Sequence, residues 1–105
     1  MLVERMTAQE AKDLLAFCLE RGTVIPSKHF RDELAKETID MNDAWFILRS
    51  GAIYDGPEQD IKTGEWKYRI EARVPDGQWI AIVFKFRTED TAFLITVFSV
   101  EKMRR

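Results

Sequence analysis

Several basic side chains are spaced to bind phosphate from one face of a strand. In WKYRIEARV (residues 66–74) apolar and charged residues alternate strictly, and successive side chains of a strand point to opposite faces. The basic residues expected on one face are Lys67, Arg69 and Arg73, with Lys85 on the next strand. Such a face could bind an RNA backbone and stabilise the extra negative charge of phosphodiester cleavage without a metal ion. The alternative is the solvated outer face of an amphipathic strand, with Glu71 paired to a neighbour.

A second candidate group surrounds the only histidine of the chain. His29 lies in SKHFRDEL (residues 27–34), next to Lys28 and close to Arg31. In the first turn of a helix, the free N–H groups and the helix dipole favour a neutral imidazole and attract an anion. A neutral histidine can act as a base near pH 7. The alternative is that His29 bonds a strand carbonyl and only fixes the helix on the sheet.

Other reactive groups are few. Cys18 lies on the apolar face of an expected helix, which favours a core residue over a reactive thiol, and a single cysteine forms no internal disulfide. One histidine and one inward cysteine are a poor start for a metal site, and no cofactor motif is present. We therefore expect neither metal nor cofactor. The phenylalanines at 84, 86, 93 and 98 could stack bases, but their apolar neighbours favour the core.

Three helices are expected before any long strand. The first covers residues 7–21 and opens with the capping box TAQE, and Gly22 stops it. The second starts at the cap Ser27 and runs to about residue 36, with Phe30 and Leu34 facing inward. The third is expected to start at the cap Asn42 and to end at Gly51. Its staple positions would be Met41 and Phe46.

The second half of the chain predicts strands. The expected strands are 66–74, 79–86 and 93–100, with a turn at 75–77 and a further short strand at 52–54. The last two long strands are apolar on both faces, which indicates central strands covered on both sides. Residues 24–26 read as an extended link and 55–65 as a polar, mobile loop. The pattern predicts an α+β fold, with N-terminal helices packed on one side of an antiparallel sheet of three to four strands.

Length and charge narrow the function classes. A chain of 105 residues fits a single domain, with a helical extension (1–23), a core (24–100) and a charged tail (101–105). The net charge of -2 gives no overall attraction to nucleic acid, so a basic site must be a local patch. No signal peptide and no run of about 20 apolar residues is visible. We expect a cytoplasmic protein with no membrane partner.

The motifs together resemble a bacterial family of domains of unknown function (DUF, number 4258), over roughly residues 24–100. The resemblance is carried by SKHFRDEL, the LRSG that ends the third helix, GEWKYRIEARVPDGQWIAIVF and FLITVF. That family looks related to the RelE and BrnT groups of small toxins, which are similar in plan, with helices followed by an antiparallel sheet. Those toxins cleave RNA and are held inactive by an antitoxin protein. The resemblance therefore implies an RNA substrate and an antitoxin partner.

The resemblance also implies residue roles. His29 or Tyr68 would aid proton transfer at the 2′-hydroxyl, and Arg31, Lys67 and Arg69 would bind phosphate and stabilise the transition state. Alternation puts Tyr68 on the opposite face from Lys67 and Arg69, so the two faces can share a site only if a bulge intervenes. The competing hypothesis is a non-catalytic module that binds a protein or peptide through the sheet or through residues 55–65. The mild acidity of the chain favours that hypothesis.

Overall fold

The computed structural model describes residues 3–100, which form an α+β fold with three helices and one five-stranded sheet. The helices are α1 (Ala8–Glu20), α2 (Lys28–Lys36) and α3 (Met41–Ser50). The strands are β1 (Thr23–Pro26), β2 (Glu58–Gln59), β3 (Trp66–Arg73), β4 (Trp79–Thr88) and β5 (Thr91–Ser99). The expected tail 101–105 lies outside the described residues.

Two helix starts follow the expected capping chemistry. Thr7 accepts from the backbone N–H of Glu10, and the Glu10 carboxylate accepts from the N–H of Thr7, so the capping box of α1 is formed. Ser27 caps α2 by accepting from the N–H of Phe30. Its hydroxyl also donates to the carbonyl of Ile95 in β5. The cap of α2 therefore fixes the helix start on the sheet.

The start of α3 differs from the expectation. The N-cap is Asp40, not Asn42, and it forms a reciprocal capping box with Asp43. Both aspartates are acceptors near the positive helix end, which favours this start over one two residues later. The staple positions become Ile39 and Ala44 in place of Met41 and Phe46, and both are buried. Gly51 ends the helix as expected.

The sheet has one strand more than expected and is not wholly antiparallel. Its order is β1-β5-β4-β3-β2, which places β4 and β5 centrally. The expected link at residues 24–26 is an edge strand that pairs parallel to β5, with Val24 opposite Ala92. The turn at residues 75–77 forms as expected, and Gly77 takes a φ of 101° there. The possible strand at 52–54 is reduced to one bridge between Ala52 and Glu71.

The segment 55–65 contains more regular structure than a polar loop. Strand β2 pairs with the start of β3, with Glu58 opposite Lys67. The connecting turn is held by Asp60, whose Oδ1 accepts from the N–H groups of Lys62 and Thr63 at 2.8 and 3.1 Å. These backbone hydrogen bonds lower the pKa of Asp60. The segment is therefore a short hairpin closed by an Asx turn.

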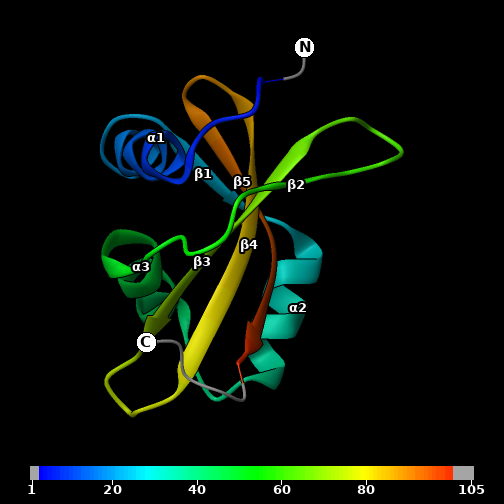
Figure 1. Cartoon of the computed structure of the whole chain (residues 1–105). Helices are drawn as coiled ribbons and strands as arrows, with labels where there is room; N and C mark the ends of the chain where they lie inside the picture. The colour runs from blue at the N-terminus through cyan, green and yellow to red at the C-terminus, as the bar shows by residue number, and fades with distance from the viewer. Residues whose placement is uncertain (1–2, 101–105) are drawn as a thin grey trace.

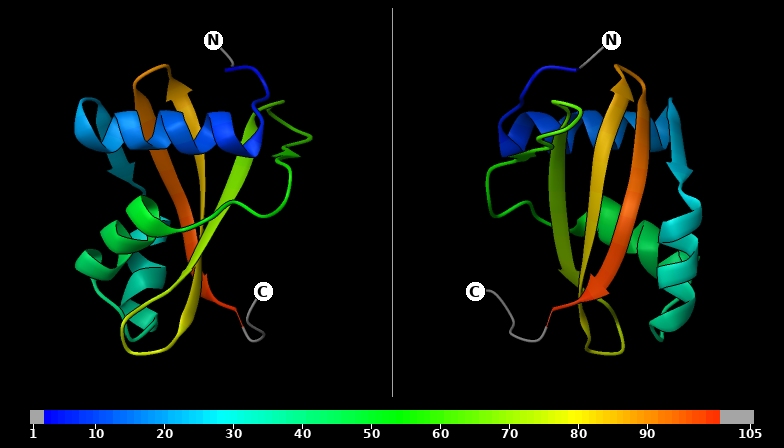
Figure 2. Two further views of the ribbon diagram at one scale, coloured as in Figure 1. Left: turned by 60° about the vertical axis from the view of Figure 1, so that its left-hand side comes forward. Right: turned by 90° about the vertical axis from the view of Figure 1, so that its right-hand side faces the viewer.

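The helices cover the two faces of the sheet unequally. Figure 1 shows α1 and α3 on one side of the sheet, and the right-hand view of Figure 2 shows α2 at the edge of the sheet beside β5. In the right-hand view of Figure 2, β3, β4 and β5 face the viewer with no helix in front of them. The expectation that β4 and β5 are covered on both faces is therefore wrong for this face, which we call the open face. Its large side chains shield it themselves.

The core lies between the sheet and the helices α1 and α3. On α1, the inward residues Ala11, Leu15 and Cys18 are buried, and α2 contributes Phe30 and Leu34 as expected. Burial, together with the charge of nearby Asp90, raises the pKa of the Cys18 thiol to about 11. The thiol therefore stays protonated near neutral pH, in keeping with a packing role.

Replacing the two alternative caps of α3 tests where the helix begins. Asp40→Ala removes the acceptor for the Asp43 N–H and should lower the free energy of unfolding by about 1 kcal/mol in urea denaturation. Asn42→Ala is the matched control, because Asn42 lies inside the helix, and should cost clearly less. A larger loss for Asn42→Ala would contradict the observed start.

Candidate functional site

The open face collects the basic residues that the alternation of β3 predicts. The pairing of β3 with β4 is regular from Tyr68–Phe84 to Arg73–Trp79, and it contains no bulge on β3. Lys67, Arg69 and Arg73 therefore share one face, and Lys85 joins them from β4. Because no bulge intervenes, Tyr68 points to the opposite face.

Arg69 belongs to a packed cluster at the middle of the open face. Its Nε lies 2.9 Å from Oε2 of Glu71, but the N–H is not aligned for a hydrogen bond and has no other acceptor among residues 3–100. The contact is therefore mainly charge–charge. The guanidinium carbon lies 5.0 Å from the ring centroid of Phe98, and the Arg69 side chain remains 36% exposed.

Glu71 is a buried member of this cluster, and the sequence pattern predicted its pairing with a neighbour but not its burial. Its side chain is 1% exposed, although it lies on the face without helices. Oε1 accepts a hydrogen bond of 2.9 Å from the indole Nε1 of Trp79. A buried carboxylate is costly unless it is paired, and here it is paired with Arg69 and bonded to Trp79. The cluster therefore restricts where the Arg69 guanidinium can lie.

The two lysines of the open face are paired with acids of the β2–β3 hairpin. Nζ of Lys85 lies 2.7 Å from Oε1 of Glu65, and this bond lowers the pKa of Glu65. Nζ of Lys67 lies 3.9 Å from Oδ2 of Asp60. The hairpin thus reduces the net positive charge that these lysines offer to a ligand.

Two arginines near the ends of β3 and β4 have no carboxylate within ion-pair distance in the described part of the chain. Arg73 is exposed, and its Nε donates to the carbonyl of Gly77 at 3.4 Å. Arg87 is exposed, and its guanidinium carbon lies 3.8 Å from the ring centroid of Phe93. Arg87 is not among the predicted site residues, because the strand was expected to end at Phe86, whereas β4 continues to Thr88. The continued alternation of KFR was the available signal.

The expected core position of the phenylalanines holds for two of the four. Phe84 and Phe86 are buried and contact the ring of Tyr68. Phe93 and Phe98 are half-buried on the open face, under guanidinium groups. Arginine and aromatic side chains are therefore interleaved on this face.

The group around His29 lies on a different element. His29 and Arg31 are exposed on α2, and Nε2 of His29 lies 3.9 Å from Oε1 of Glu33 one turn later. Lys28 is paired with Asp32 at 2.9 Å. Helix α2 lies along β5, and β4 lies between β5 and β3. The spacing of neighbouring strands puts β3 and β5 about 10 Å apart. Within residues 3–100, no hydrogen bond or ion pair joins this group to β3.

Tyr68 lies in the core rather than beside Arg69. Its side chain is 2% exposed, and its hydroxyl accepts from the backbone N–H of Met6 at 2.9 Å. Burial raises the pKa of the phenol, although the Met6 N–H opposes the shift. Tyr68 therefore anchors the segment before α1, and the arrangement does not bring it to an RNA strand on the open face.

Two kinds of feature are absent from the described residues. Within residues 3–100, no three or more His, Cys, Asp or Glu side chains are grouped so that they could hold a metal ion. None of the helices in that range has the length and apolar character needed to cross a membrane.

Removing the indole donor to Glu71 tests the packed cluster. Trp79→Phe keeps the aromatic ring but deletes a hydrogen bond to a buried carboxylate, and should lower the free energy of unfolding by roughly 1.5–3 kcal/mol. Trp45→Phe is the control, because the Trp45 indole is half-buried and makes no hydrogen bond within the described residues. Equal losses in chemical denaturation would show that the bond to Glu71 contributes nothing.

The Lys85–Glu65 pair predicts a pH effect with a definite sign. A glutamate whose pKa is lower in the folded state than in the unfolded chain stabilises the fold when the pH is above the ordinary pKa of about 4.3. That contribution is lost as pH falls through the lowered pKa. Glu65→Gln should therefore lose less stability than the parent between about pH 6 and pH 3 in urea titrations. Glu58→Gln, on the exposed strand β2, should behave as the parent does; a parent-like profile for Glu65→Gln would refute the effect.

Comparison with known proteins gives one match. The family model described as Domain of unknown function (DUF4258) matches residues 27–99. No curated protein and no solved structure matches the chain. The matched segment leaves out α1 and β1, yet α1 contributes three buried residues to the core and β1 pairs with β5. Both elements are thus integral to this fold.

Proposed function

We propose that this chain, which belongs to the family Domain of unknown function (DUF4258), is a metal-independent ribonuclease toxin of the RelE/BrnT-like type. The observation that carries the proposal is the open face of the sheet, where arginines and aromatic rings are interleaved. Guanidinium groups bind phosphate, and aromatic rings stack with unpaired bases, so both parts suit a single RNA strand. The antitoxin partner of such toxins is part of this proposal.

Arg69 is the residue to which we assign charge stabilisation. In cleavage by the 2′-oxygen, the O2′–P bond forms while the P–O5′ bond breaks, and the phosphoryl oxygens gain negative charge in the transition state. A cation held beforehand near those oxygens stabilises that charge without reorganising. Glu71 and Phe98 hold the Arg69 guanidinium in place before any substrate binds. Arg73 and Arg87 would bind the flanking phosphates.

Proton transfer is assigned to His29, since Tyr68 is buried on the opposite face. The exposed imidazole of His29 lies on α2, beside β5. The 2′-hydroxyl that gives its proton to His29 and the phosphate beside Arg69 belong to one nucleotide, so the two side chains can act together only if they reach toward each other over β4 and β5. The departing 5′-oxygen then takes its proton from water. Lys28 and Arg31 on α2 would bind the same RNA strand beyond β5.

A second function is favoured by the charge balance of the open face. Lys67, Arg69 and Lys85 each lie within 3.9 Å of a carboxylate, which weakens the pull on a polyanion. A protein or peptide partner tolerates such a balanced surface better than RNA does. We therefore keep a non-catalytic binding module as the alternative.

Expression of the chain alone in a bacterial host tests the proposal. We expect growth arrest with fragmented RNA, and loss of both effects in Arg69→Ala, because the transition-state charge then has no fixed partner. Arg21→Ala at the exposed end of α1 is the control and should remain toxic. His29→Ala should abolish fragmentation while RNA binding by the purified protein persists in EDTA.

Two outcomes would contradict the proposal. A folded, toxic Arg69→Ala variant would refute the assignment of Arg69. Normal growth and intact RNA with the folded parent chain would refute the ribonuclease and support the binding module.

A further inference from the structure

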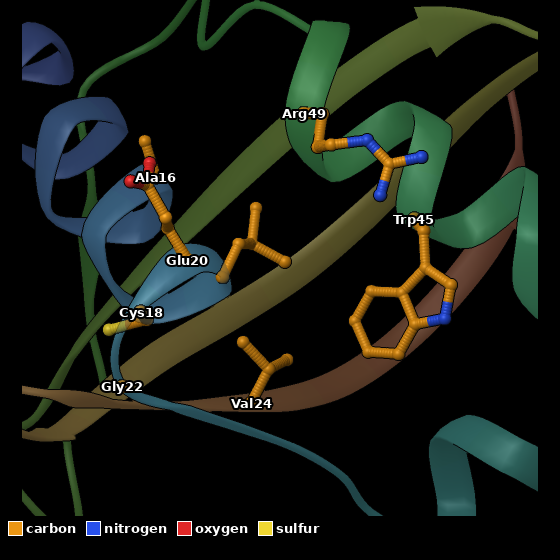
Figure 3. Close-up of a pocket in the computed structure, with 8 residues that line it drawn as sticks. Ala16, Cys18, Glu20, Gly22, Val24, Trp45 and Arg49 are labelled. Atoms are coloured by element: carbon orange, nitrogen blue, oxygen red, sulfur yellow. The ribbon is translucent and has the colours of Figure 1, made fainter.

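A groove remains between α1 and α3 at the β1 edge of the sheet, on the side away from the open face. It encloses about 690 Å³. Its apolar lining includes Leu19, Val24 and Trp45, and its charged lining residues are Glu20 and Arg49. Figure 3 shows Trp45 and Arg49 projecting from α3, across from Glu20 on α1, with Val24 below them.

The groove exists because the helical layer is incomplete over β1. Val24 pairs with Ala92 and shares its face of the sheet. Ala92 is fully buried, whereas Val24 is only half-buried. Trp45 is likewise packed against the core and only partly covered. The apolar surface that one more helix would cover is thus left open to solvent.

The backbone of β1 is poorly suited to receive an extended peptide instead. The N–H groups of Thr23 and Ser27 donate to the carbonyls of Asp90, just before β5, and of Leu94 in β5. By alternation, the backbone N–H of Val24 points away from β5, and so would that of residue 26, but proline has no N–H. The free edge therefore offers one outward donor, that of Val24, which is too little for strand addition. A helix that fills the groove with side chains needs no such donors.

The charged residues at the groove indicate which charges a partner helix should carry. Arg49 has no carboxylate within ion-pair distance among residues 3–100, and it is exposed next to Trp45. We propose that the groove binds an amphipathic helix of a partner protein, with an apolar ridge on Leu19, Val24 and Trp45 and a carboxylate beside Arg49. This surface lies across the sheet from Arg69, and the proposal does not depend on RNA cleavage.

A designed peptide tests this site without RNA. The probe is a fluorescein-labelled helical peptide of about four turns, with one leucine stripe and glutamates beside the stripe. We expect saturable binding to the purified chain by fluorescence anisotropy, and a loss of roughly tenfold or more in Arg49→Glu. The same peptide with lysines in place of glutamates should regain affinity for Arg49→Glu. That reversal identifies the charge contact rather than general stickiness.

Matched controls make the result decisive. Lys36→Glu carries the same change of sign on exposed α2 and should bind as the parent does. A version of the peptide with a central proline cannot form a continuous helix and should not bind. The proposal is overturned if the leucine–glutamate peptide does not bind, if Arg49→Glu binds it equally well, or if the proline version binds as tightly. Self-association through the groove with no peptide binding would also overturn it.

Discussion

The strict alternation of β3, on a sheet that has helices α1 and α3 on one face only, is the constraint on which the rest of the structure depends. It sends Tyr68 and Ile70 into the core and Arg69 and Glu71 to the open face. A shift of register by one residue would bury the arginine in the core and expose the tyrosine. Because Tyr68 also holds the backbone of Met6, the same register ties the segment before α1 to the sheet.

The fold was predictable where the signal is local. The capping box of α1, the inward stripes of the helices and the alternation of β3 each depend on residues a few positions apart. Strand β1 was missed because its partner in β5 lies 68 residues away, as in the pair Val24–Ala92. The cap of α3 was misplaced because Asp40 and Asn42 both suit that position, and only the reciprocal bond with Asp43 decides between them.

The candidate site was predictable in residue type but not in electrostatics. Alternation identified Lys67, Arg69 and Lys85. Their carboxylate partners come from three different places: Asp60 in a turn, Glu65 just before β3, and Glu71 within β3. The two lysine pairings need the hairpin of residues 58–67, whose two-residue strand has no sequence pattern of its own. On the open face, Arg73 and Arg87 have no carboxylate partner among residues 3–100, and they support RNA binding here more directly than the paired lysines do.

The open face and the groove lie on opposite sides of one sheet, and this geometry restricts how a partner could regulate an RNA-binding face. A helix seated beside Arg49 cannot cover Arg69 by itself, because the sheet and the core lie between them. Inhibition through the groove would require either a second segment that passes around the sheet edge or a shift transmitted through β1 and β5. Close-packed sheets resist such shifts. A bipartite partner, anchored in the groove and reaching the open face, is therefore the arrangement that best joins the two proposals.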